Sequence, residues 1–119
     1  SMIEISSGES RRLLIGRALV HAPKVLILDE PTTNLDLHAL HTLRGYLRKI
    51  AQTGIGIIMV THQLHDIIPE ITRVILMHDG RIVHDGLKEE ILIDRHISRL
   101  FSIPIKIREE EGYYYATGY

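Results

Sequence analysis

Apolar residues recur along the chain with two different spacings, which predict where its helices and strands lie. From residue 9 to residue 22 the apolar positions fall close to helical spacing, and Pro23 ends this pattern. The run "VLIL" at residues 25–28 is too short for a helix and is typical of a strand buried on both faces. Apolar residues then recur every three or four positions across residues 37–50, which predicts an amphipathic helix that ends near residues 53–54.

Three further segments predict strands. The stretches "GIIMVTH" at residues 56–62 and "RVILMHDG" at residues 73–80 are apolar enough for two more buried strands. A strand, a helix and a strand in succession imply parallel neighbours joined by a right-handed crossover. The dipeptide Asp79-Gly80 is a hairpin turn signal, and the segment "RIVHDG" at residues 81–86 therefore predicts a short antiparallel strand.

The last third of the chain predicts two short helices and a second hairpin. The helices are expected around residues 87–92 and 94–101. The tail at residues 103–119 alternates moderately between apolar and polar positions, with turn residues at 109–112. The whole order of elements predicts an α/β fold.

Composition narrows the class of protein. The chain has 119 residues, enough for one compact domain, and its 45% apolar and 24% charged residues are typical of a globular protein. The formal net charge of −1 gives no electrostatic reason to expect a nucleic-acid partner. There is no cysteine, which excludes disulfides and thiolate metal sites within these residues and fits a cytoplasmic location. No apolar run has the roughly 18 to 20 residues of a membrane-spanning helix.

Polar side chains follow two of the predicted strands. Asp29 and Glu30 come directly after the first strand, and His62 closes the second. Ligands collect at the carboxyl ends of parallel strands, and a carboxylate pair beside a dry core is costly unless a cation is there. One carboxylate would bind Mg²⁺ through water and the other would orient a water molecule. The alternatives are that the acidic pair only opens a loop and caps the next helix, and that His62 is structural.

The stretch "ISSGES" precedes the first predicted helix and allows two interpretations. Ser6 at the N-cap and Glu9 three residues later form a capping box. The free N–H groups of the same helix end form an anion site, because a helix N-terminus carries partial positive charge. The pattern is therefore compatible with a helix cap and with a phosphate-binding element.

Taken in order, these motifs resemble the ATP-binding-cassette (ABC) ATPases. Residues 5–9 ("ISSGE") are similar to the family's signature motif, and residues 25–30 ("VLILDE") to its Walker B strand. Residues 33–36 ("TNLD") are similar to the D-loop, and His62 to the switch histidine. The resemblance implies a partial P-loop NTPase core with parallel strands, crossover helices and C-terminal antiparallel hairpins.

The resemblance also implies a role for each matching residue. Asp29 would contact Mg²⁺ through water, Glu30 would polarise the attacking water, and His62 would contact the γ-phosphate of ATP. Asp36 would lie at the interface with a second ABC ATPase domain. In a head-to-tail dimer, Ser6, Gly8 and the N-terminus of the following helix would hold the γ-phosphate of ATP bound to that second domain. Ser7 and Glu9 complete this ATP-binding motif.

One family element is missing from this sequence. None of the four lysines follows a glycine, so the chain lacks the G-x-x-x-x-G-K-[ST] cradle for the β- and γ-phosphates, known as Walker A. The chain is therefore expected to be the C-terminal half of an ABC ATPase domain, with a motif-bearing core at residues 5–86 and helices and a hairpin at residues 87–119. On its own it is expected not to hydrolyse ATP. An edge exposed on the Walker B strand is expected to cause self-association.

The resemblance implies an ATP-binding subunit of an ABC transporter, held at the cytoplasmic side of a membrane by transmembrane subunits. Two alternatives stay open. One is a soluble ABC ATPase of the DNA-repair or translation type. The other is a non-catalytic binding protein that supplies its signature motif to an intact partner.

Overall fold

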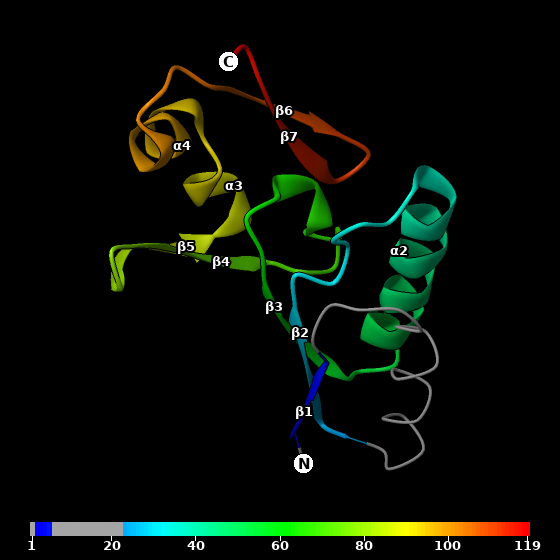
Figure 1. Cartoon of the computed structure of the whole chain (residues 1–119). Coiled ribbons are helices and arrows are strands. Elements are labelled where there is room, and N and C mark those ends of the chain that lie inside the picture. Colours follow the sequence, from blue (N-terminus) through cyan, green and yellow to red (C-terminus); the bar gives the residue numbers. More distant parts are fainter. Residues whose placement is uncertain (1, 6–22) are drawn as a thin grey trace. The chain divides into compact units, whose positions relative to one another are not determined.

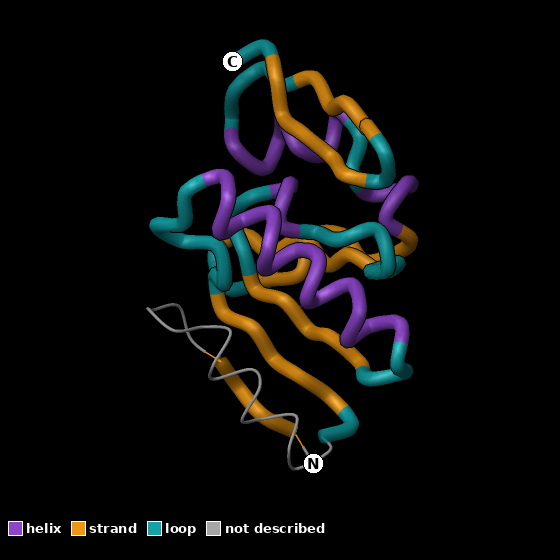
Figure 2. Tube along the Cα trace, turned by 90° about the vertical axis from the view of Figure 1, so that its right-hand side faces the viewer, coloured by secondary structure: helices purple, strands orange, loops and turns teal. Residues whose placement is uncertain are grey.

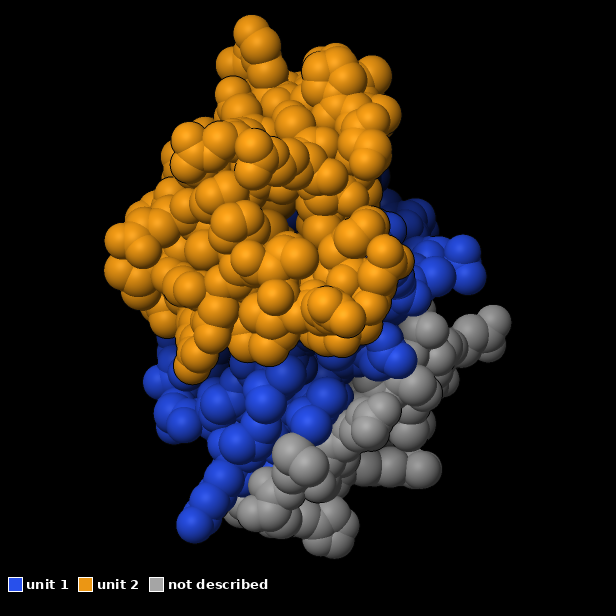
Figure 3. Space-filling model, turned by 90° about the vertical axis from the view of Figure 1, so that its left-hand side faces the viewer, with its two compact units in different colours: residues 1–70 blue, residues 71–119 orange. Residues whose placement is uncertain are grey.

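The computed structural model describes residues 2–5 and 23–119. The chain divides into two compact units, Ser1–Glu70 and Ile71–Tyr119 (Figure 3). The predicted helix at residues 9–22 and the signature residues 6–9 lie outside the described residues. The division of the chain after residue 86 stays a prediction.

A parallel sheet of three strands forms the framework of the first unit within the described residues. Strand β1 (Met2–Ile5), strand β2 (Val25–Asp29) and strand β3 (Gly56–Val60) follow one another in the order β1-β2-β3, all parallel (Figure 1). The sequence patterns predicted β2 and β3 as parallel neighbours, and this is confirmed. The patterns did not predict β1.

Strand β2 contributes two fully buried side chains to this unit's core. Leu26 and Leu28 are both 0% exposed, as the apolar run predicted. Its neighbours β1 and β3 pair with β2 on its two sides. The expectation that β2 would be an exposed edge is therefore wrong, and self-association of the chain stays a prediction without that support.

Strand β3 differs from the expectation of a strand buried on both faces. Its side chains alternate, and Ile58 and Val60 are 51% and 54% exposed. Among the described strands β3 is an outer one, with β2 on one side only. The apolar run predicted a strand correctly, but burial depends on what covers each face, which a local pattern does not specify.

Helix α2 (Leu37–Gln52) lies along one face of this sheet (Figures 1 and 2). The helix begins after Asp36, whose Oδ1 accepts a hydrogen bond from the Ala39 amide at 2.7 Å. It buries an apolar stripe that consists of Leu43, Leu47 and Ile50. The chain leaves the helix through Gly54, at φ +95°, which favours glycine because a side chain there would be strained.

The second unit begins with a β-hairpin. Strand β4 (Arg73–His78) and strand β5 (Arg81–Leu87) are antiparallel, and the turn residues Asp79 and Gly80 have φ values of 50° and 73°. Positive φ at both central positions matches the Asp-Gly turn signal. However, β4 is not buried on both faces as expected, because in its two-stranded sheet only alternate side chains are buried.

Two short helices and a second hairpin complete the second unit. Its elements are helix α3 (Lys88–Ile91), helix α4 (Asp94–Phe101), strand β6 (Lys106–Glu110) and strand β7 (Tyr113–Thr117). The side chain of Asp94 joins α4 to β6 by accepting the Ile107 amide at 2.7 Å. All four elements were expected from the sequence. Among residues 2–5 and 23–119, none of the helices combines the length and the apolar character of a membrane span.

The end of α2 is tied to the last residue of the first unit. The Nε of Arg48 lies 3.0 Å from both carboxylate oxygens of Glu70, and Gln52 donates to the same carboxylate at 3.0 Å. Burial by itself would raise the pKa of Glu70. The hydrogen bonds from Gln52 and Arg48 outweigh it, so the pKa lies below its usual value.

We expect Glu70→Gln to lower the free energy of unfolding by about 1 kcal/mol at neutral pH. Because the folded state lowers the pKa of Glu70, the stabilisation is fully present above its ordinary value of 4.5 and is lost as the pH falls through the folded value. Urea unfolding followed by circular dichroism across this pH range measures the difference. Glu110→Gln, at an exposed position of β6, is the control. An equal loss at every pH would contradict the prediction.

Candidate functional site

The candidate site lies where β2 and β3 end. Strand β2 ends at Asp29 and β3 at Val60, which are paired in the parallel register. The Glu30 amide donates to the carbonyl of Val60 at 2.7 Å, so the pairing extends one residue past the end of β2. The two loops that follow therefore leave the same edge of the sheet together.

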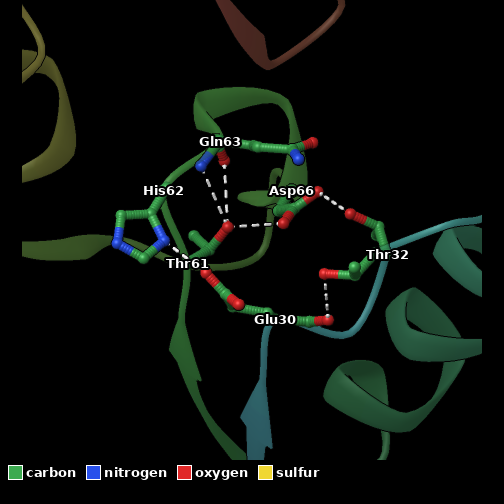
Figure 4. A network of polar contacts seen from close by, with 7 residues as sticks. Glu30, Thr32, Thr61, His62, Gln63 and Asp66 are labelled. Carbon is green, nitrogen blue, oxygen red and sulfur yellow. Dashed lines mark hydrogen bonds and ion pairs between the residues drawn. The ribbon is translucent and has the colours of Figure 1, made fainter. Parts of the chain in front are cut away.

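The structure brings Glu30 and His62 into direct contact. The Oε1 of Glu30 meets the Nδ1 of His62 (Figure 4). The His62 side chain is 80% exposed and the Glu30 side chain 39%, so both can be reached from solvent. Two residues 32 positions apart, each predicted as a site residue, thus form one cluster with a carboxylate and an imidazole.

The backbone at Glu30 adopts an uncommon conformation. Its φ is 46°, in the left-handed region, and Asn34 has a φ of 65°. The carbonyl of Glu30 accepts hydrogen bonds from the Thr33 amide at 3.3 Å and the Thr33 hydroxyl at 3.1 Å. This tight turn directs the Glu30 side chain towards the loop after β3, where His62 lies (Figure 4).

Asp29 lies at the end of β2, and its side chain is exposed. The expectation that both carboxylates lie beside a dry core is therefore wrong. The structure describes no group of three or more acidic, histidine or cysteine side chains placed to hold a metal. Mg²⁺ does not need such a group, because it keeps several waters and binds through one or two carboxylates and substrate phosphates. An exposed Asp29 beside Glu30 fits that kind of binding.

Asp36 begins α2 as its N-cap. The alternative that the acidic pair Asp29-Glu30 caps this helix is therefore wrong, because Asp36 does so. The predicted place of Asp36 at a dimer interface stays a prediction. The signature residues, Ser6 to Glu9, lie outside the described part of the chain.

One residue of the site was not predicted from the sequence. Asp66, in the short 3₁₀ helix η1 (Leu64–Asp66), is 2% exposed, and its two carboxylate oxygens accept the hydroxyls of Thr32 and Thr61 at 2.5 Å each (Figure 4). The two threonines lie within two residues of Glu30 and His62 in the sequence. The sequence did contain a signal for this residue. Hydroxyl side chains lie close to Glu30 and His62 in the sequence, and an acidic residue follows four positions after the histidine.

The family model described as "AAA domain, putative AbiEii toxin, Type IV TA system" matches residues 2–65, more than half of the chain. This range includes strands β1 to β3 and the cluster of Glu30 and His62. The match thus covers the part of the chain that carries the candidate site.

Curated relatives are ABC transporter components. The chain is 37% identical over 105 residues to the ABC transporter ATP-binding protein YlmA of Bacillus subtilis, covering 87% of this chain and 40% of YlmA. It is 34% identical over 111 residues to the hemin import ATP-binding protein HmuV of Hahella chejuensis, covering 87% of this chain and 43% of HmuV. The chain therefore spans less than half the length of these relatives.

Two solved structures share the fold. CbiO1 of Clostridium perfringens, part of the ABC transporter complex CbiONQ, is 34% identical, with a TM-score of 0.61 over 75% of this chain and 36% of CbiO1. A metal-chelate type ABC transporter in an inward-facing conformation has a TM-score of 0.71 at 24% identity, over 87% of this chain and 42% of that chain. With the order of motifs and the α/β fold, these similarities show that the chain belongs to the ABC ATPases, within the P-loop NTPases.

Proposed function

We propose that this chain is part of the ATP-binding subunit of an ABC transporter, and that Glu30 and His62 act together on the γ-phosphate of ATP. The contact between their side chains at the ends of two paired strands carries this proposal. The relatives support it, because YlmA and HmuV are named as ATP-binding proteins of transport systems.

Glu30 is the proposed general base. Its carboxylate is partly exposed and lies against the imidazole ring of His62. A carboxylate so placed can accept a proton from a water that attacks the γ-phosphate. The tight turn at Glu30 limits the directions that its side chain can take, which favours one position for that water.

His62 is the proposed γ-phosphate contact. Its ring is held on one side by Glu30 and is otherwise largely exposed, so a phosphate can approach the remaining nitrogen. An imidazole N–H directed at a phosphate oxygen is a hydrogen bond that exists only while the phosphate is present. Mg²⁺, held through water by Asp29, would neutralise part of the charge on the phosphates.

The remaining parts of the proposal concern partners. A second ABC ATPase domain would dock head to tail, with Asp36 at the interface and the signature residues 6–9 directed at the partner's ATP. Transmembrane transporter subunits would hold the pair at the cytoplasmic side of a membrane. In support, CbiO1 is part of an ABC transporter complex.

We expect the chain alone neither to bind ATP with micromolar affinity nor to hydrolyse it. The reason is that its sequence has no G-x-x-x-x-G-K-[ST] cradle to neutralise the triphosphate. Titration calorimetry with MgATP and a phosphate-release assay measure the two properties. Micromolar binding, or turnover that Glu30→Gln removes, would overturn this expectation.

Joined behind the cradle-bearing segment of an intact relative, the chain should support ATP turnover. In that chimera Glu30→Gln should lower kcat by about 10²- to 10⁴-fold, the usual contribution of a general base. MgATP affinity should change little, because the amide keeps the size of the carboxylate. Single-turnover phosphate release and equilibrium nucleotide binding separate the two effects.

The matched control for this substitution is Glu89→Gln, which makes the same chemical change at an exposed position of α3. It should leave kcat unchanged. If the Glu30 and Glu89 variants turn over ATP equally well, Glu30 is not the base and the proposed mechanism fails.

A further inference from the structure

The buried carboxylate of Asp66 has no part in the chemistry proposed above. Its Oδ1 accepts the Thr32 hydroxyl and its Oδ2 the Thr61 hydroxyl, each at 2.5 Å (Figure 4). The Nε2 of His65 lies 3.9 Å from Oδ1. Each oxygen of one carboxylate therefore binds a different strand-end loop, since Thr32 follows β2 and Thr61 follows β3.

Each of these threonines is close in sequence to a proposed site residue. Thr32 is two residues after Glu30, and Thr61 immediately precedes His62. We infer that Asp66 is a positioning residue that fixes the two loops to each other and so holds Glu30 against His62. This role deepens the proposed function and rests on it.

The backbone conformation of the first loop supports this role. Thr32 lies between the two residues with positive φ, Glu30 at 46° and Asn34 at 65°. Side-chain-bearing residues adopt this region rarely, so surrounding contacts must hold them there. The hydroxyl of Thr32 provides such a contact within the turn, because it is bound to Asp66 on a different part of the chain.

The free-energy cost of burying the Asp66 carboxylate also supports its role as a positioning residue. A carboxylate out of water is destabilising unless its hydrogen bonds are well made, and an apolar side chain of similar volume would fill the same space. The carboxylate contributes something that an apolar side chain cannot. Its two acceptor oxygens belong to one rigid group and therefore fix the positions of two hydroxyls relative to each other. The hydroxyl of Thr61 is further fixed by accepting the Gln63 amide at 3.0 Å.

Asp66→Asn is the variant that separates positioning from folding. The amide has the size of the carboxylate, but one of its two polar atoms is a donor. Since Thr61 already accepts the Gln63 amide, the new NH₂ group would face Thr32, whose hydroxyl can turn and accept. We therefore expect the variant to fold with a weakened connection between the loops.

The test uses the His62 ring signals in NMR spectra of the full chain at one fixed pH, without nucleotide. In the native background Glu30→Gln should shift these signals, because it changes the atom in contact with the ring. In the Asp66→Asn background the same substitution should shift them much less, because Glu30 is no longer held at the ring. Asp85→Asn, which removes an exposed carboxylate of β5 bonded to Arg73, is the control and should leave the full shift.

Amide hydrogen exchange gives a second readout on the same samples. In Asp66→Asn the amides of Glu30 and Gln63 should exchange about 10- to 100-fold faster, the effect of losing a hydrogen bond to a charged group. Amides in α2, such as that of Leu47, should keep their native rates. A uniform increase that follows global stability, or an undiminished His62 shift, would overturn the role of Asp66.

If Asp66→Asn does not fold, Thr32→Val removes one of the two hydroxyls at nearly constant volume and should give the same pattern. Neither readout involves ATP. If the chimera does not turn over ATP but Asp66→Asn changes the NMR and exchange readouts as expected, only the proposed function is rejected. If ATP turnover is seen but these readouts do not change as expected, only the positioning role of Asp66 is rejected.

Discussion

The hydrogen bond from the Glu30 amide to the Val60 carbonyl is the contact on which the arrangement of the site depends. It continues the parallel pairing of β2 and β3 beyond the last residue of β2, so both loops start at the same level of the sheet. The carboxyl ends of parallel strands lie at one edge of the sheet. At this edge the carboxylate of Glu30 contacts the imidazole of His62, although the two residues are distant in sequence. A shift of one residue in this register would turn each side chain to the opposite face.

Elements defined by local patterns could be predicted from the sequence. The apolar run with Leu26 and Leu28 predicted a buried strand, and the structure buries both residues completely. The spacing of Leu43, Leu47 and Ile50 predicted the amphipathic α2, and the Asp79-Gly80 turn predicted the first hairpin. The sequence also placed Glu30 and His62 at the carboxyl ends of two parallel strands, whereas the direct contact between their side chains is a finding of the structure.

Features that depend on distant partners could not be predicted in the same way. Exposure of Ile58 depends on whether another element covers that face of β3, and nothing in the strand's own residues specifies this. The role of Asp66 was missed for a similar reason. Its hydrogen bond to Thr61 is local, but its hydrogen bond to Thr32 spans 34 positions, so its connection of the two loops has no signature in a short window of sequence.

At position 30, the left-handed backbone conformation makes different residues favourable for stability and for the proposed activity. Glycine adopts a φ of 46° without the steric cost that a side chain bears, so backbone energy favours glycine here. Glycine has no side chain that could accept a proton from water, whereas a carboxylate can. The proposed role as general base therefore favours glutamate. Selection for thermal stability alone would thus remove the carboxylate. Consensus or stability-guided engineering of such a chain should leave position 30 unchanged even where a replacement raises the melting temperature.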